Sequence, residues 1–277
     1  MARIASLSVL LDPSGQMLLK ENYASVIANV QKGTVSGLIK NTDLSGDPTA
    51  GTVEAKRFQN ASSQAYGTAR TAGAGTKVTG KTVTIPIDTN REFVEEIEEK
   101  DISLLGVDGL LAKRAANHAI RMAAELDTAF FACGQTEGTA FTPSQGTTTV
   151  PAILEESILT LEELRTNYVD GVPRDLMFMV CSPSYYSQMR NYLDTVVNTG
   201  ITTKDEKFER YHGVPIVSSN RLPNNVNFEL MVTGSIAQPV MAHPYSAEKI
   251  PLSEAYGVSL FWYYGTKAVT PELILVG

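Results

Sequence analysis

Histidine and cysteine, the residues that most often mark a metal site in a sequence, are few in this chain and lie far apart. The three histidines, His118, His212 and His243, stand away from cysteine and from one another, so none has the spacing of a metal-ligand pair. We expect His118 to serve in packing or at an interface and the other two to be surface residues. Cys133 and Cys181 sit in apolar contexts, which predicts buried free thiols and a reducing compartment. The sequence therefore predicts no metal site.

The motifs that hold cofactors or build a hydrolase site are also missing. The run GTARTAGAG, which begins at Gly67, has neither the spacing of a phosphate-binding loop nor that of a dinucleotide fingerprint. Ser182 precedes Pro183 outside any GxSxG elbow. We therefore expect no cofactor and no enzyme activity. The alternative is an enzyme whose Gly-rich stretch from Gln59 to Gly80 is a flexible lid.

Charge and hydrophobicity exclude further classes of function. The chain has 277 residues and a formal net charge of -7, which argues against a broad basic surface for reading DNA. No stretch approaches the roughly 20 apolar residues of a membrane span. The apolar run at the start, MARIASLSVLLDPSGQ, is too short for a signal peptide. A folded protein without a membrane partner is expected.

A long helix from Ser103 to Gly134 is the element around which the chain is organised. Ser103 is the expected cap and Gly134 the expected stop. Helical spacing produces an apolar row of Leu104, Val107, Leu111, Ala115, Ala119, Met122, Leu126 and Phe130, and an offset polar row of Arg114, Asn117, Arg121, Glu125 and Thr128. We expect the first row to be buried and the second to face water or neighbouring subunits.

Two segments before this helix lack the bulk for a core of their own. Residues 1 to 50 alternate short helical pieces with polar connections and read as an arm that packs on the body or on another subunit. Next, TVEAKRF from Thr52 and KTVTIPID from Lys81 read as the two strands of a hairpin. The stretch between them, rich in Gly, Ala, Ser and Thr, is expected to be an exposed loop, and a loop this long is usually functional or held by a partner.

An acidic segment, REFVEEIEEKDI from Arg91 to Ile102, leads into the long helix. Its apolar contacts are expected from Phe93, Val94 and Ile97. The glutamates Glu95, Glu96, Glu98 and Glu99 are expected to be solvated or to meet basic residues across an interface.

After the long helix the pattern alternates between helices and strands. We predict helices over AILEESILTLEELRTNY and from Pro183 through SYYSQMRNYLDTV, and strands over LMFMVCS, VPIVSS and Phe228 to Val232. A surface loop is expected over GITTKDEKFERYHG. Strands around Leu260 to Tyr264 and Glu272 to Val276 are expected to return to the long helix. The fold class is α+β.

The order of these parts resembles the major capsid protein of tailed bacteriophages, whose Hong Kong 97-type fold is shared with encapsulins. The matching segments are KTVTIPIDTNREFVEEIEEKDI leading into LLGVDGLLAKRAANHAIRMAAELD, then HGVPIVSSNRLP, and finally YYGTKAVTPELILVG. The resemblance implies an N-arm at residues 1–50, an E-loop at 51–90, a P-domain with the spine helix at 91–149 and 235–277, and an A-domain at 150–234. It covers essentially the whole chain.

The resemblance also implies a function and a set of partners. A major capsid protein self-assembles as hexamers and pentamers into an icosahedral head that encloses double-stranded DNA without reading its sequence. The implied partners are a separate scaffolding protein, a portal and a decoration protein, and the implied location is the virion capsid, assembled in the host cytoplasm. An encapsulin-like shell that loads protein cargo is the alternative.

Arms and hairpins of such subunits extend over neighbouring copies, so contacts between subunits are expected along them and along the spine. The candidate contact residues are Tyr23, Arg57, Tyr66, Arg70, Lys77, Lys81, Glu95, Glu96, Arg114 and Arg121. Some members cross-link an E-loop lysine to a neighbour's asparagine. Lys77 and Lys81 lie in the matching region, but the sequence identifies no asparagine partner and no acidic catalyst, so two exposed lysines are expected.

Overall fold

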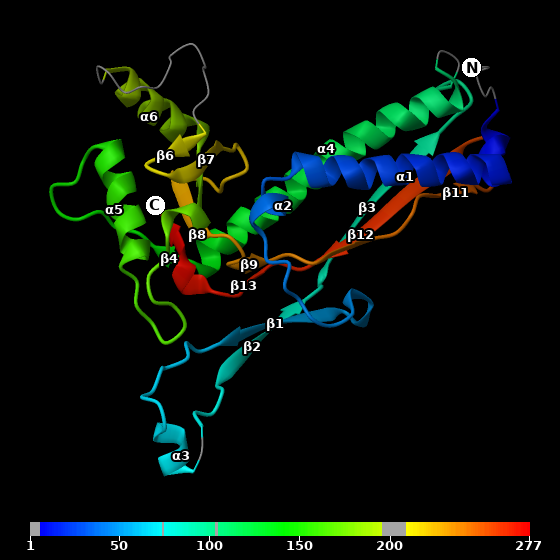
Figure 1. The fold of residues 1–277 in the computed structure, drawn as a ribbon. Coiled ribbons are helices and arrows are strands. Elements are labelled where there is room, and N and C mark those ends of the chain that lie inside the picture. Colours follow the sequence, from blue (N-terminus) through cyan, green and yellow to red (C-terminus); the bar gives the residue numbers. More distant parts are fainter. Residues whose placement is uncertain (1–5, 74, 103–104, 196–208) are drawn as a thin grey trace.

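The computed structural model describes residues 6–73, 75–102, 105–195 and 209–277. A long helix, α4 (Gly106–Glu137), crosses the molecule obliquely, with α1 (Pro13–Gly33) beside it. A narrow antiparallel sheet runs along one half of α4, and a six-stranded sheet with two helices stands at its other end (Figure 1). A hairpin projects away from both.

The helix α4 is the predicted spine, with a different end. The described members of its apolar row, Val107 to Phe130, are all buried, as expected. The predicted stop at Gly134 is wrong, because the helix continues to Glu137 and the Gly138 amide donates to the Gly134 carbonyl. Gly134 serves packing instead, since a Cβ there would lie 2.6 Å from the carboxylate of Glu229. The predicted cap, Ser103, lies outside the described residues.

The N-terminal segment packs on its own body. It forms η1 (Leu7–Leu11), α1 and the short α2 (Ser36–Ile39). The expected short helical pieces are wrong for residues 13–33, which form one helix, because Leu19, Val26 and Val30 recur on one face and join the apolar core around α4. The carboxylate of Asp127 on α4 accepts hydrogen bonds from the Val35 and Ser36 amides, which holds α2 against the spine.

The narrow sheet consists of β3 (Thr89–Ile97), β10 (Val240–Ala242), β11 (Ser246–Lys249) and β12 (Tyr256–Tyr264). The central strand β12 pairs with β3 from Tyr256–Ile97 to Tyr264–Thr89 and buries alternate side chains toward the helices. The acidic segment therefore supplies a strand. Phe93 and Ile97 pack inward, but the apolar contact expected of Val94 is wrong, since its side of the strand faces outward and it is 60% exposed.

The six-stranded sheet has the order β4-β14-β8-β5-β7-β6. Its strands are β4 (Thr139–Ala140), β14 (Ile274–Val276), β8 (Phe228–Val232), β5 (Met177–Cys181), β7 (Val214–Ser218) and β6 (Arg210–Tyr211). The predicted strands at β5, β7 and β8 are confirmed. Of the two C-terminal strands, β12 lies along the spine, whereas β14 enters this sheet and packs Ile274 near the end of α4. It starts later than expected because Pro271–Leu273 forms η4.

Two helices accompany the six-stranded sheet. α5 (Val150–Glu162) and α6 (Pro183–Thr195) follow the predicted helices, but α5 ends before the predicted Tyr168. The amides of Gly171 and Val172 donate to the carbonyls of Leu164 and Leu161, which folds the chain back, and η3 (Arg174–Leu176) leads into β5. Most of the predicted surface loop, residues 200–213, lies outside the described residues.

The projecting hairpin consists of β1 (Thr52–Phe58) and β2 (Gly80–Pro86), preceded by η2 (Pro48–Ala50). Both predicted strands are confirmed. Near the body, Val53, Ala55, Val83 and Ile85 pack over β9 (Ile236–Ala237) and the turn after β13 (Lys267–Ala268). Farther out the strands separate, and the expected plain loop contains the short helix α3 (Thr68–Ala72) (Figure 1).

Candidate assembly surfaces

The base of the hairpin is fastened to the body by Arg57. Its guanidinium is nearly buried, pairs with the carboxylate of Glu272 and lies 4.4 Å from the centre of the Tyr168 ring. A little farther along, the Asn60 amide donates to the Asn167 carbonyl at 2.9 Å. Arg57, a predicted contact between subunits, is thus engaged within its own chain, where it sets the direction in which the hairpin projects.

The outer part of the hairpin carries side chains that its own chain leaves uncovered. Phe58, Tyr66 and Val78 are 61%, 92% and 76% exposed. Arg70 donates to the Tyr66 hydroxyl at 2.9 Å, so these two predicted contact residues form one exposed pair. Lys77 and Lys81 are exposed, as expected. Large apolar side chains left exposed at three points along one projecting element fit a surface that a partner covers.

The spine carries a half-buried polar cluster where β3 meets α4. Two predicted contact residues, Glu95 and Arg114, form an ion pair with each other. His118 is 3% exposed, stacks on Phe93 at 4.5 Å and lies 2.6 Å from the Tyr245 hydroxyl. The hydrogen bond from Arg114 holds the pKa of Glu95 below its usual value despite partial burial. The expected packing role of His118 is confirmed.

The outward face of α4 borders two grooves. One, of about 500 Å³, is lined by residues that include Asn117, Arg121 and Thr128 of the polar row. The other, of about 410 Å³, lies around Ile120, which is 65% exposed. Both grooves reach Arg221. Arg121, a predicted contact residue, is exposed on the first groove.

The remaining candidates lie apart from these grooves. Glu96 is exposed on the outward face of β3. Tyr23 on α1 donates from its hydroxyl to the Ala242 carbonyl at 2.9 Å and lines a pocket inside its own chain. Burial raises the pKa of this hydroxyl. The structure therefore brings together Glu95 with Arg114 and Tyr66 with Arg70, and leaves the other candidates separate.

Clusters of metal-binding side chains and helices able to span a membrane are both absent from the described part of the chain. No group of three or more His, Cys, Asp or Glu in those residues is placed to hold a metal ion. The helices described there include none with the length and apolar character to cross a bilayer. Both cysteines are free, as predicted. Cys181 is buried, whereas the predicted burial of Cys133 is wrong, because that residue is only partly covered.

Similarity to known proteins is found in the fold. No protein-family model matches the chain, and no curated protein sequence matches it. A chain from Mycobacterium phage Che8 matches with a TM-score of 0.61 at 18% identity, over 82% of this chain and 84% of that chain. The capsid structure of cyanophage P-SCSP1u matches with a TM-score of 0.59 at 12% identity, over 86% and 85%. This chain has the Hong Kong 97-type capsid fold.

The chain is also similar in fold to the subunit of a virus-like particle. The virus-like particle from Pyrococcus furiosus matches with a TM-score of 0.57 at 11% identity, over 93% of this chain and 96% of that chain. Both the predicted α+β class and the predicted capsid fold are therefore confirmed. What the sequence did not reveal is that Glu95, Arg114 and His118 form one cluster within the chain. Its signal was the alternation that puts Phe93, Glu95 and Ile97 on one face of a strand.

Proposed function

We propose that this protein is the shell subunit of a phage-type icosahedral capsid, assembling as hexamers and pentamers around double-stranded DNA. The observation that carries the proposal is the projecting hairpin, whose exposed apolar tip has no cover within its own chain, on a body with the capsid fold. Modest contacts repeated across a closed shell add up to a stable particle. No catalytic role is proposed.

The assignment of segments to the parts of a capsid subunit belongs to this proposal. Residues 51–90 serve as the E-loop that reaches a neighbouring copy, and residues 1–50 as the N-arm. The spine with its narrow sheet serves as the P-domain, and most of the six-stranded sheet with α5 and α6 as the A-domain. The candidate contacts at Tyr66, Arg70, Lys77, Lys81, Glu96 and Arg121 belong to surfaces that neighbouring copies cover. A net charge of -7 fits confinement of DNA without tight binding.

Further partners are proposed from the same architecture. A separate scaffolding protein guides assembly, a portal occupies one vertex, and a decoration protein binds the outer surface. The particle is the virion capsid, assembled in the host cytoplasm. A second candidate, a protein-loaded compartment, is supported by the match to nearly the whole length of the Pyrococcus furiosus virus-like particle chain.

Deleting residues 62–78 tests the proposal, because it removes the exposed tip and leaves both strands of the hairpin. We expect the intact protein to form shells or capsomers in negative-stain micrographs, with a scaffolding protein supplied where required, and the deletion variant to remain unassembled. Matched circular dichroism and thermal unfolding show that the body is still folded. The control is Leu159→Ser, which removes an exposed apolar side chain of α5 and should leave assembly intact.

Two results would count against the proposed function. Shells formed by the deletion variant would contradict the role of the hairpin, and an intact protein that stays monomeric with scaffold at high concentration would contradict the shell itself. The nuclease-protected content of purified native particles separates the two candidates, since DNA supports the capsid and a protein cargo supports the compartment.

A further inference from the structure

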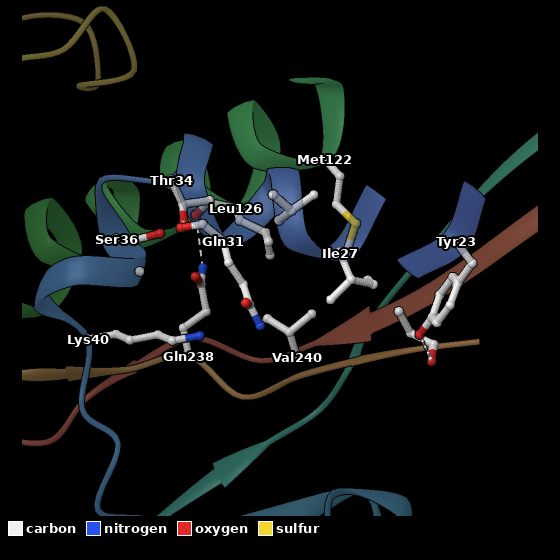
Figure 2. A pocket seen from close by; sticks show the side chains of 13 residues that line it. Tyr23, Ile27, Gln31, Thr34, Ser36, Lys40, Met122, Leu126, Gln238 and Val240 are labelled. Atoms are coloured by element: carbon white, nitrogen blue, oxygen red, sulfur yellow. Dashed lines mark hydrogen bonds between the residues drawn. The ribbon is translucent and has the colours of Figure 1, made fainter. Parts of the chain in front are cut away.

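A pocket of about 460 Å³ lies between the N-terminal helices, the spine and the strand β10. Figure 2 shows that its walls differ from one end to the other. Lys40, Gln31 and Gln238 come together at one end, and aliphatic side chains occupy the middle. Those include Ile27 and Val240, and Tyr23 stands at the far end. The volume falls within the usual range of small-molecule sites.

Lys40 is the one charged residue among the described residues that line this pocket. It is half-buried, and burial lowers the pKa of its ammonium group. Within the described part of the chain, no carboxylate lies within 4.0 Å of this ammonium, and no hydrogen bond from it is found. A half-buried charge without a partner is costly, so this end of the pocket is complementary to an anion.

The backbone holds Lys40 in this place. Its amide donates to the Ser36 carbonyl at 2.9 Å, within the turn that Asp127 ties to α4. The next residue, Asn41, donates from its amide to the Ile236 carbonyl at 2.7 Å. Gln238 is fixed as well, since its side-chain amide donates to the Leu126 carbonyl at 2.9 Å. The backbone that carries Lys40 and the side chain of Gln238 are therefore held in place before any ligand arrives, which lowers the entropic cost of binding.

The rest of the pocket selects for an aliphatic group. Ile27, Val30, Met122, Leu126, Val240 and Ala242 provide apolar surface between Lys40 and Tyr23. The Tyr23 hydroxyl already donates a hydrogen bond to the Ala242 carbonyl. The far end of the pocket therefore presents the aromatic ring of Tyr23 and no free hydroxyl donor. One cation followed by an apolar slot matches one carboxylate followed by a hydrocarbon chain.

We propose that this pocket binds an amphipathic monocarboxylate, a medium-chain fatty acid whose carboxylate pairs with Lys40 while its chain lies along Ile27, Met122 and Val240. Gln31 lines the same pocket, and its side-chain amide, which points into the pocket in Figure 2, is available to donate a second hydrogen bond to the carboxylate. The site is separate from the hairpin and from the outward grooves of α4. It does not depend on whether the chain forms a shell.

Calorimetric titration of the full chain with decanoate, kept below its micelle-forming concentration, tests this proposal. We expect saturable binding at one site per chain. Decanol should bind at least about tenfold more weakly, because it lacks the charge that pairs with Lys40. Acetate, which lacks the chain, should show no saturation. As pH rises toward the range where free Lys40 loses its proton, binding should take up a proton, seen as a dependence of the heat on the buffer.

Three variants make the result specific to the pocket. Lys40→Met should lower the affinity for decanoate about tenfold or more, and Lys40→Arg should keep most of it. Lys32→Met, at an exposed position of α1, is the matched control and should leave the affinity unchanged. Equal binding of decanol and decanoate, or unchanged affinity in Lys40→Met, would overturn the proposal. So would binding of an acidic peptide but not of decanoate.

Discussion

Glu229 is a carboxylic acid enclosed in the middle of the protein, on β8 where that strand faces α4. It has no exposed surface, and neither carboxylate oxygen has a hydrogen-bond partner. Burial raises the pKa of this group to about 9, so the carboxyl keeps its proton at neutral pH. The missing side chain of Gly134 leaves the room that the carboxyl occupies.

This burial predicts that stability falls as pH rises. The unfolded chain ionises Glu229 near its ordinary pKa of 4.5, while the folded chain holds the proton up to about 9. Across that window the folded state binds the extra proton, so the free energy of unfolding should decrease by about 1.4 kcal/mol per pH unit from this group. Glu229→Gln, which cannot ionise, should remove that slope.

Urea unfolding of both proteins between about pH 5 and about pH 8 measures the effect. The free energy gained by Glu229→Gln relative to the native sequence should grow with pH. Glu163→Gln, at an exposed position, is the control and should keep the slope. A constant difference between Glu229→Gln and the native sequence across the range would show that Glu229 is ionised in the folded state.

Residue types alone did not reveal these environments. The run FELMV predicted the strand β8, and a glutamate inside an apolar run was the signal that one acid is buried. Gly134, which leaves room for the Glu229 carboxyl, lies on α4, far from β8 in the sequence. In the same way, Glu95 and Arg114 were expected at an interface between subunits. The sequence did not show that they pair with each other, because the packing of β3 beside α4 depends on the tertiary fold.

At the scale of elements, the hairpin depends on how its base is fastened. Arg57 joins β1 to Glu272 of η4 and to Tyr168 after α5. Arg57→Met should therefore lower the free energy of unfolding by about 1–3 kcal/mol, because a nearly buried charged partner is lost and Glu272 is left unpaired. Chemical denaturation measures the loss.

A second ion pair provides the matched control for Arg57. Arg165 and Asp170 are both well exposed, so Arg165→Met should cost no more than about 1 kcal/mol. Equal effects of the two substitutions would show that Arg57 contributes nothing beyond an ordinary surface pair. Hydrogen exchange at the amides of Gln59 and Asn60, which donate to the Thr79 and Asn167 carbonyls, should quicken in Arg57→Met only.

The elements themselves were largely predictable, because periodicity depends on local sequence. The spine, both hairpin strands and the strands β5, β7 and β8 follow from apolar spacing. The errors concerned the ends and the continuity of helices, which depend on tertiary contacts. The glycine at position 134, inside α4, leaves room for Glu229 and does not mark the end of the helix, and α1 is continuous because α4 covers its apolar face.

At the scale of the whole molecule, the tip of the hairpin should report on assembly. Arg70 and Lys77 are exposed in the single subunit, so trypsin should cut the free chain early at these positions. In assembled particles a neighbouring copy covers the tip under the proposed function, and the same cleavage should be slowed. Mass spectrometry of timed digests measures both rates.

The double variant Arg70→Gln/Lys77→Gln shows which fragments come from the tip, since it lacks these two cleavage sites. Equal rates of tip cleavage in free and assembled protein would place the hairpin outside the contacts between subunits. The order of the parts along the chain was enough to predict the capsid fold. How neighbouring copies meet does not follow from the sequence, because those contacts join surfaces of different chains.

The pairing of β3 with β12 has a consequence for the order of events during synthesis. Ile97 meets Tyr256 and Thr89 meets Tyr264, so the sheet that supports the spine lacks its central strand until nearly the whole chain has been made. At ordinary translation speeds the wait is on the order of ten seconds. A ribosome that stops early releases a chain whose spine has no sheet to cover it. Chains truncated before Tyr256 lack this pairing, so only a nearly complete chain can finish the sheet beside the spine.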